Sequence, residues 1–298
     1  MRPHSLAVIG LGAIGGSVAW QARLAGVPSV IGYSPDRADS VQALKAGAVH
    51  DIAESPAQAV RGADLVMLAA PPLAILALLG DLPPHLSPDA IVTDVASIKA
   101  PVVARARDVG LTERFAGGHP FAGTHQAGWG GARPDRLAGA VVYVCPTGPE
   151  GERAVREVMN FWETVLGAYP VRIEAAVHDA QLGWTSHLPQ AVASVLAHTL
   201  AREPSLRGVS LSTGVRDTTR LAASPSGMWV DIFLLNRGPI CEALTRAEGE
   251  LAALRDLIGR GDRAGLRDYL EEAGAYRRHF DSEPGSVRPG RAPDRESQ

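Results

Sequence analysis

Cysteine and lysine are both scarce in this 298-residue chain. Cys145 and Cys241 are the only cysteines, and Lys45 and Lys99 are the only lysines. Two cysteines supply neither a disulfide framework nor a zinc cluster, and they are typical of a protein in a reducing compartment. The shortage of lysine leaves few candidates for a Schiff-base mechanism, whereas arginine, a fork-shaped binder of carboxylates, is abundant. We therefore expect no metal site.

Long apolar runs and a strong net charge are also missing. The longest apolar run, Leu73–Leu79, is too short to span a bilayer. A formal net charge of −3 gives no reason to expect a nucleic acid or a membrane surface as partner. Arg2 precedes an apolar stretch, as in a secretory signal, but no clear small-residue cleavage site follows. The composition therefore agrees with a soluble, cytoplasmic enzyme, with a small molecule rather than a nucleic acid or a membrane as the expected partner.

The most informative motif is a glycine fingerprint near the N-terminus. An apolar run, Leu6–Ile9, leads into a glycine-rich turn and then into a helical pattern. In a dinucleotide-binding fold, the first glycine permits the turn, the second lets the backbone approach a pyrophosphate, and the third lets the helix pack closely on the strand. An ordinary glycine-rich turn is the alternative, and the strand before it and the helix after it favour the dinucleotide site. The residues expected at the cofactor are Gly10, Gly12, Ala13, Ile14 and Gly15.

Short apolar runs alternate with helical patterns through the first half of the chain. The strands are expected at Leu6–Ile9, Ser29–Gly32, Leu65–Ala70, Ala90–Thr93, Phe115–Gly117, Val141–Cys145 and Tyr169–Ile173. Helices are expected at Gly15–Ala25, Ser40–Ala46, after Pro72, at Pro101–Val109 and at Glu150–Leu166. This order predicts an α/β Rossmann-type, doubly wound parallel sheet over residues 1–174. An all-helical substrate and dimerisation domain is expected over residues 175–280, and a disordered tail over residues 281–298.

Polar residues follow several of these strands. Ser34 follows the second strand, Pro71 the third, Asp94 and Ser97 the next, and His119 the one after, in a glycine-rich loop over residues 117–124. Ligands of open parallel sheets bind beyond the carboxyl ends of the strands, so these residues are expected in the cofactor cleft. An N-cap role for Asp94 and Ser97, at the start of the following helix, remains an equal alternative.

The helical half carries two further candidate clusters. A long helix is expected over Glu174–Arg202, where Pro189 should cause a kink and free the Thr185 carbonyl. His187, beside that kink, is either a hydrogen-bonded interior histidine or part of a substrate site. Arg216 and Arg220 share a helix face, where they either clamp a carboxylate or are solvated surface charges.

Taken together, the motifs resemble those of the prephenate/arogenate dehydrogenase family of tyrosine biosynthesis. The matching segments occur in the family's order and are Gly10–Gly15, Thr93–Lys99, Gly118–Thr124, His178-Asp179, Ser186–Pro189, Arg216–Arg220 and Met228-Trp229. The resemblance implies a homodimer formed through the helical domain. It also implies oxidative decarboxylation of prephenate to 4-hydroxyphenylpyruvate and carbon dioxide.

The resemblance implies roles for individual residues. His119 is the expected base for the substrate hydroxyl, and Ser97 is expected to orient that hydroxyl beside the nicotinamide. The residues expected at the substrate are Arg220, Arg216, Asp217, His187, Gln190 and Thr124. Some relatives have histidine where this chain has Gln190, so that contact is expected to differ.

The cofactor is expected to be NAD, with NADP left open. Ser34 and Arg37 would accept a 2′-phosphate, whereas Asp36 would bind the 2′-hydroxyl and repel a phosphate. Ala70, Pro71 and Asp94 are the other residues expected at the cofactor.

Several alternatives remain open at this point. Arogenate is the alternative substrate. Another Rossmann hydride-transfer enzyme, such as a β-hydroxyacid dehydrogenase or an imine reductase, is a second possibility, although the hydroxyacid enzymes would require a catalytic lysine in the helical part, and the chain has none after Lys99. A nucleotide-sensing dimerisation module without catalysis is the third.

Overall fold

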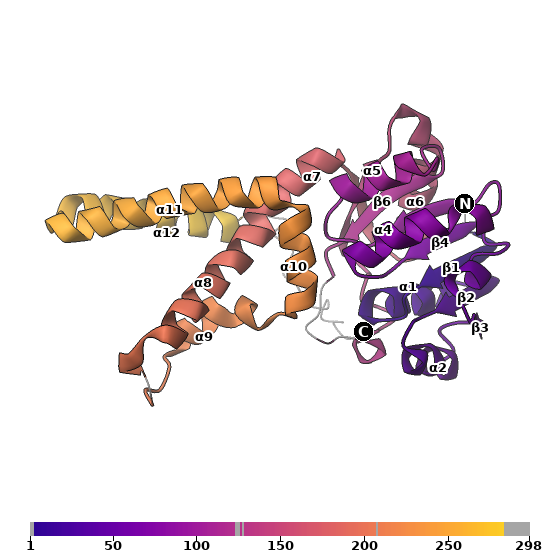
Figure 1. Cartoon of the computed structure of the whole chain (residues 1–298), viewed down its shortest axis with the longest axis horizontal. Helices are drawn as coiled ribbons and strands as arrows, with labels where there is room; N and C mark the ends of the chain where they lie inside the picture. Colours follow the sequence, from indigo (N-terminus) through magenta and orange to yellow (C-terminus); the bar gives the residue numbers. More distant parts are fainter. Residues whose placement is uncertain (1–2, 123–125, 127, 207, 283–298) are drawn as a thin grey trace, which may run out of the picture. The chain divides into compact units, whose positions relative to one another are not determined.

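The computed structural model describes residues 3–122, 126, 128–206 and 208–282 (Figure 1). The chain divides into two compact units between Ile240 and Cys241. The first unit holds the whole sheet and the helices up to α10, and the second holds most of α11 together with α12. The last strand ends at Arg172, and the helices and turns described beyond it contain no strand.

An eight-stranded sheet with the order β3-β2-β1-β4-β5-β6-β7-β8 forms the centre of the first unit. Neighbouring strands are parallel except for β6 and β7, which pair antiparallel, with His119 opposite Tyr143. The strands are β1 Ser5–Ile9, β2 Ser29–Tyr33, β3 Asp51–Ile52, β4 Leu65–Leu68, β5 Ile91–Asp94, β6 Phe115–Pro120, β7 Val141–Pro146 and β8 Tyr169–Arg172.

Helices cover both faces of this sheet. Alternate residues of each central strand point to opposite faces, so Leu6 and Val8 join one apolar cluster, while Ala7 and Ile9 join the other. The first cluster includes side chains of α1, α2 and α6, and the second includes side chains of α3, α4 and α5. These helices are α1 Ala13–Leu24, α2 Arg37–Lys45, α3 Pro56–Ala59, α4 Pro72–Asp81, α5 Ala100–Asp108 and α6 Glu152–Thr164.

The predicted Rossmann-type class is confirmed, and three details differ from the prediction. The two-residue strand β3 was not predicted, because it is too short to show an alternating pattern. The sheet is not wholly parallel, since β7 runs against β6. His119 lies inside β6 rather than in a loop after it, because the strand continues through Gly117 and Gly118 to Pro120.

The expected long helix around Pro189 consists of three parts. Between α7, Ala175–Leu182, and α8, Leu188–Arg202, lies a π-helical turn, Gly183–His187. The Leu188 amide donates to the carbonyl of Gly183, five residues back. The predicted irregularity therefore takes the form of a widened turn just before the proline. The remaining helices are α9 Thr213–Thr219, α10 Ser226–Leu235, α11 Arg237–Arg260 and α12 Arg263–Ser282.

The second unit is a helical hairpin. The turn between α11 and α12 contains Gly261 with φ +65°, and Asp262 accepts a hydrogen bond from the Gly265 amide at 2.9 Å. Helix α12 continues to Ser282, two residues into the segment that the sequence predicts to be a disordered tail. The rest of that predicted tail lies outside the described residues.

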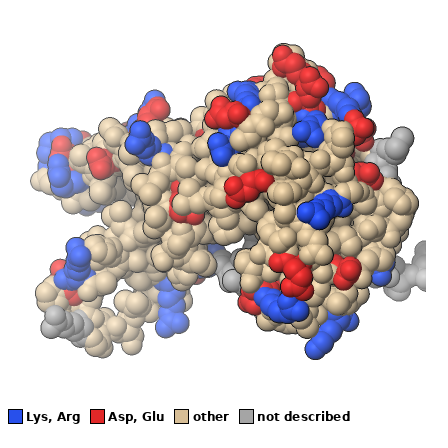
Figure 2. Space-filling view, turned by 45° about the vertical axis from the view of Figure 1, so that its right-hand side comes forward, with Lys and Arg blue, Asp and Glu red and all other residues tan. Residues whose placement is uncertain are grey.

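Two further observations concern the charge of the surface and the length of the apolar helices. Acidic and basic side chains are interspersed over the face shown in Figure 2. Among the described residues, no helix combines the length and the apolar character needed to cross a membrane.

Candidate active site

The turn after β1 has the form of a dinucleotide cradle. Gly10 has φ +105°, and a Cβ there would collide with the carbonyl oxygen of Ala69, while a Cβ on Gly15 would collide with the carbonyl oxygen of Gly10. Gly12 is the N-cap of α1 and supplies no side-chain cap, and no acidic residue stands in the first turn. The first amides of α1, including those of Ala13 and Ile14, are therefore open to a phosphate.

The ends of β2 and β3 enclose a small cavity of about 140 Å³. Asp36, a predicted cofactor residue, caps α2, because its Oδ1 accepts from the Ala38 amide at 2.8 Å. The amide of Ser34 donates to the Ser40 hydroxyl at 3.1 Å. Arg37 lies 3.1 Å from a carboxylate oxygen of Glu54, which was not predicted as a site residue. Both Arg37 and Glu54 line the cavity.

Two further predicted cofactor residues stand after β4. Ala70 is half-buried, and Pro71 is exposed at the start of α4. Their position at the carboxyl end of β4, next to the Gly10 turn, is the one expected for residues beside a dinucleotide.

Asp94 belongs to a buried ion pair. Its carboxylate and the Lys99 ammonium are both fully buried and lie 2.5 Å apart. Asp94 also accepts from the amides of Ala96 at 2.8 Å and Gly118 at 3.1 Å. Burial raises the pKa of Asp94, and Lys99 and the two amides oppose this rise. The Asp94 side chain does not serve as an N-cap, because its oxygens are engaged by Lys99, Ala96 and Gly118, and α5 begins only at Ala100. A cofactor contact of Asp94 stays a prediction.

This ion pair holds the strand that carries His119. Lys99 Nζ donates to the carbonyl oxygen of Gly118 at 2.6 Å, while Asp94 accepts from the amide of the same residue. A Cβ on Gly118 would collide with the Asp94 carbonyl oxygen, so glycine is required where the two strands approach. The peptide groups on both sides of Gly118 are thereby fixed, one residue before His119.

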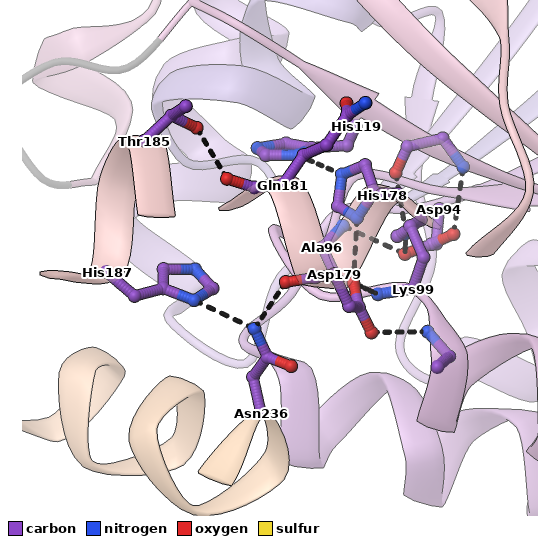
Figure 3. A network of polar contacts seen from close by, with 12 residues as sticks. Asp94, Ala96, Lys99, His119, His178, Asp179, Gln181, Thr185, His187 and Asn236 are labelled. Carbon is purple, nitrogen blue, oxygen red and sulfur yellow. Dashed lines mark hydrogen bonds and ion pairs between the residues drawn. The ribbon is translucent and has the colours of Figure 1, made fainter. Parts of the chain in front are cut away.

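His119 begins a chain of buried side chains (Figure 3). Its Nδ1 lies 2.8 Å from His178 Nε2, and His178 Nδ1 lies 2.7 Å from Asp179 Oδ1. Asp179 also caps α5, accepting from the amides of Lys99 and Ala100 at 2.7 Å each. The exposed fraction is 9% for His119 and 0% for His178.

The surroundings of His119 favour its neutral form. Burial, followed by the nearby His178, Lys99 and His187, holds the pKa of His119 well below its usual value. A neutral imidazole can accept a proton, as a general base must.

Ser97 lies in the loop between β5 and α5, beyond the carboxyl end of β5. It is half-buried, and its hydroxyl has no hydrogen-bond partner among the described residues. Thr124, a predicted substrate residue, lies outside the described residues.

Unpartnered polar atoms gather around the π-helical turn. His187 Nδ1 lies 3.0 Å from the amide nitrogen of Asn236, but its Nε2 is buried without a partner in the described part of the chain. Gln190 Oε1 and Trp229 Nε1 are also buried without a hydrogen-bond partner among the described residues. His187 is thus a hydrogen-bonded interior histidine at one nitrogen, and the predicted substrate role of the other nitrogen stays a prediction.

The pKa of His187 gives stability a defined pH dependence. Burial lowers this pKa from 6.5 to about 4. Below pH 6.5 the unfolded chain takes up a proton that folded His187 refuses until about pH 4, so the free energy of unfolding should fall across this window. Urea unfolding at a series of pH values checks this, and His187→Gln should show a shallower fall. His198→Gln, at an exposed position on α8, is the matched control and should follow the wild-type curve, so equal slopes in all three proteins would contradict the assignment.

The predicted arginine clamp is solvent-exposed. Arg216 and Asp217 lie on α9, Arg220 begins the following 3₁₀ turn, and all three are exposed. No hydrogen bond or ion pair joins any of them to His119 within the described residues. The structure therefore brings His119, His178, Asp179 and the cradle residues to one end of the sheet, but it does not bring the two arginines into contact with them.

These features define a Rossmann-type dinucleotide-binding protein with a buried, neutral histidine at the carboxyl end of its sheet. Comparison with known proteins narrows this class. The sequence matches the family model described as "Prephenate dehydrogenase, nucleotide-binding domain" over residues 18–170 and the one described as "Prephenate dehydrogenase, dimerization domain" over residues 174–272. The chain belongs to the prephenate dehydrogenase family, as predicted, and with it to the oxidoreductases.

Individual relatives agree with this result. The chain is 31% identical to the prephenate dehydrogenase of Bacillus subtilis (strain 168), covering 92% of this chain and 75% of that protein. It is 30% identical to the cyclohexadienyl dehydrogenase of Zymomonas mobilis, covering 90% and 93%. The crystal structure of A. aeolicus prephenate dehydrogenase in complex with hydroxyphenyl propionate and NAD+ is 31% identical, with a TM-score of 0.86 and coverage of 93% of this chain and 98% of that one.

Proposed function

We propose that this protein catalyses the NAD-dependent oxidative decarboxylation of prephenate to 4-hydroxyphenylpyruvate and carbon dioxide, in the cytoplasm, as a step of tyrosine biosynthesis. The observation that carries the proposal is the buried His119, held neutral at the carboxyl end of β6, in the same sheet as the glycine cradle. The named activity of the relatives in Bacillus subtilis and A. aeolicus supports it.

The chain's own residues would bind the cofactor through its phosphates and its ribose. The free amides of Ala13 and Ile14 suit the pyrophosphate, and the cavity beside Ser34 and Arg37 suits the adenosine ribose. Ala70 and Pro71 flank this path at the end of β4. When bound, the dinucleotide supplies the hydride acceptor, and the protein supplies position and proton transfer.

His119 would accept the proton of the substrate hydroxyl as the carbinol carbon loses its hydride. The bond between the ring and its carboxylate then breaks, carbon dioxide leaves, and its electron pair completes the aromatic ring. The proton held on His119 returns to the oxygen, which becomes the phenol of the product. Ser97, whose hydroxyl has no partner in the described part of the chain, would orient the substrate oxygen.

The remainder of the substrate is anionic. Arg220, with Arg216 and Asp217 beside it, would bind a carboxylate, because the two guanidinium groups have no ion-pair partner among the described residues. The unpartnered Nε2 of His187 and Oε1 of Gln190 would meet the polar side chain, and Thr124 is the remaining proposed contact.

A single assay tests the proposal. Prephenate and arogenate are each supplied to the purified enzyme with NAD and with NADP, while dinucleotide reduction and release of carbon dioxide are followed together. We expect the highest kcat/KM for prephenate with NAD. Turnover of arogenate alone would assign the related arogenate dehydrogenase activity, and dinucleotide binding without turnover of either substrate would favour the sensing module.

The Arg37–Glu54 ion pair leads to a prediction about the preference for NAD over NADP. Glu54 neutralises the guanidinium that a 2′-phosphate would need, and it adds a negative charge to the cavity wall. Glu54→Gln should free Arg37 and raise the ratio of NADP to NAD catalytic efficiencies on the order of tenfold, the value of one charge-assisted hydrogen bond. Glu152→Gln, which breaks the exposed pair with Arg172, is the matched control. A ratio unchanged in Glu54→Gln would show that this pair does not select the cofactor.

We also propose a homodimer, because the matched family model of the helical part is a dimerization domain. Leu251 and Ile258, on α11, and Leu270, on α12, are 69%, 60% and 61% exposed in the isolated chain. Leu251→Arg combined with Leu270→Arg should lower the mass measured by light scattering to that of one chain. Leu24→Arg, at a leucine 67% exposed on α1, should leave the mass unchanged. A double variant that keeps the wild-type mass would remove these leucines from the interface.

A further inference from the structure

The hydrogen-bond chain behind His119 fixes where its protons lie. Asp179 receives the amides of Lys99 and Ala100, which can only donate. Its third close partner is His178 Nδ1, at 2.7 Å from Oδ1. Both oxygens of Asp179 thus accept from backbone amides, and a carboxylate can only accept. His178 must therefore carry a hydrogen on Nδ1 and donate it to Asp179.

The position of the hydrogen on His178 then determines which nitrogen of His119 carries a hydrogen. A neutral imidazole with a hydrogen on Nδ1 has a bare Nε2, which accepts. His178 Nε2 lies 2.8 Å from His119 Nδ1, so the hydrogen of this contact belongs to His119. The remaining nitrogen of His119, Nε2, keeps its lone pair.

His178 is fully buried between the rings of His119 and Tyr143, which meet it edge to face with ring centroids 5.1 and 5.5 Å away. Among the described residues, the hydrogen-bond partners of its two ring nitrogens are therefore His119 Nδ1 and Asp179 Oδ1 alone.

We infer that His178 and Asp179 are positioning residues that lock neutral His119 in the tautomer with its hydrogen on Nδ1, so that Nε2 is the base. The inference rests on the proposed role of His119. When Nε2 takes the substrate proton, the Nδ1–H bond to His178 persists, and the Asp179 carboxylate offsets the new charge through His178. The titratable or charged groups near this relay include, among the described residues, Lys99, Asp94, His187, Tyr143 and Cys145.

The direct test is ¹⁵N NMR of the full-length enzyme labelled at its histidines, with His119→Asn used to assign the His119 signals. We expect the wild-type enzyme to show a protonated Nδ1 and an unprotonated Nε2 at His119. Asp179→Asn should lower the share of this tautomer, because an amide nitrogen in place of either oxygen meets the backbone N–H of Lys99 or Ala100, and in place of Oδ1 it can donate to His178 and move the hydrogen of His119 to Nε2. A wild-type enzyme with the hydrogen on His119 Nε2 would overturn the inference. This measurement needs no substrate, so the tautomer can be established even if prephenate turns out not to be the substrate.

Kinetics supply the second readout. Asp179→Asn should reduce kcat on the order of 10³- to 10⁴-fold, the loss seen when a catalytic histidine is held in the wrong tautomer in another enzyme. KM and the dissociation constant of NADH should change only a few-fold. Asp64→Asn is the matched control, since Asp64 also accepts two backbone amides, at 2.9 Å each, far from His119 in sequence and at the opposite end of the strands.

Should Asp179→Asn fail to fold, His178→Phe keeps the cap on α5 and removes the acceptor, and it should cost kcat about 10- to 100-fold. Wild-type kcat in either folded variant would overturn the positioning role.

Discussion

His119→Asn is expected to reduce kcat by about 10²- to 10⁴-fold, the usual contribution of a general base. Asparagine retains polarity and approximate size, but its amide cannot take up the hydroxyl proton. The dissociation constant of NADH should stay close to that of the wild type, because the cradle at Gly10–Gly15 lies on a different strand and turn. Steady-state kinetics with prephenate, together with fluorescence titration of NADH, measures both quantities.

The control for this variant is His85→Asn, at an exposed histidine in the 3₁₀ turn after α4. It should behave as the wild type in both assays. A His119→Asn enzyme with undiminished kcat would remove His119 from the mechanism. Loss of NADH binding in the same variant would instead mean that His119 supports the cofactor site.

Lys99→Met is expected to lower the free energy of unfolding by about 3–5 kcal/mol, because it leaves a buried carboxylate without its partner. Both members of the Lys99–Asp94 pair are fully buried, so water cannot replace the lost ammonium. Kinetic damage should accompany the loss, since Lys99 also holds the Gly118 carbonyl beside His119. Urea unfolding followed by circular dichroism measures the stability.

Two further variants isolate the cause. Lys99→Met combined with Asp94→Asn removes both charges and should recover part of the lost stability. Arg172→Gln breaks the exposed pair with Glu152 and should leave the unfolding midpoint near that of the wild type. Equal stability of Lys99→Met and the wild type would show that Asp94 is protonated in the folded protein.

The elements that could be predicted from the sequence are those with a local pattern. The strand before Gly10 and the helix after it follow from apolar periodicity and from glycines that the turn requires. The direction of β7 could not be predicted in this way, because an apolar strand reads the same whether its neighbour runs with it or against it. His119 was placed in a loop because two glycines precede it. Gly118 is instead a strand residue paired with Val144, and glycine is required there by the close approach of the Asp94 carbonyl, which only the three-dimensional structure reveals.

The site residues also divide into those with a local sequence signal and those without one. His119 was found because a histidine after an apolar strand points to the carboxyl end of the sheet. The sequence gives no role to His178 and Asp179, which lie 59 and 60 positions after His119. They were noticed only as one of the segments that match the family. Asp94 and Lys99 are five positions apart outside a helix, and no periodicity relates such residues. A lysine placed among apolar residues, in a chain with only one other lysine, was the available signal for that pair.

The cap that Asp179 provides to α5 spans about 80 positions of sequence, from the amides of Lys99 and Ala100 to the first helix after the sheet. A segment that ended at β8 would lack this cap and also the acceptor for His119. A chimera that takes its helical half from another protein would therefore keep these contacts to Lys99, Ala100 and His119 where the incoming α7 also supplies a histidine and an aspartate in register. The strand that carries His119 and the helix that follows the sheet thus form one structural unit across the boundary between the nucleotide-binding and helical parts.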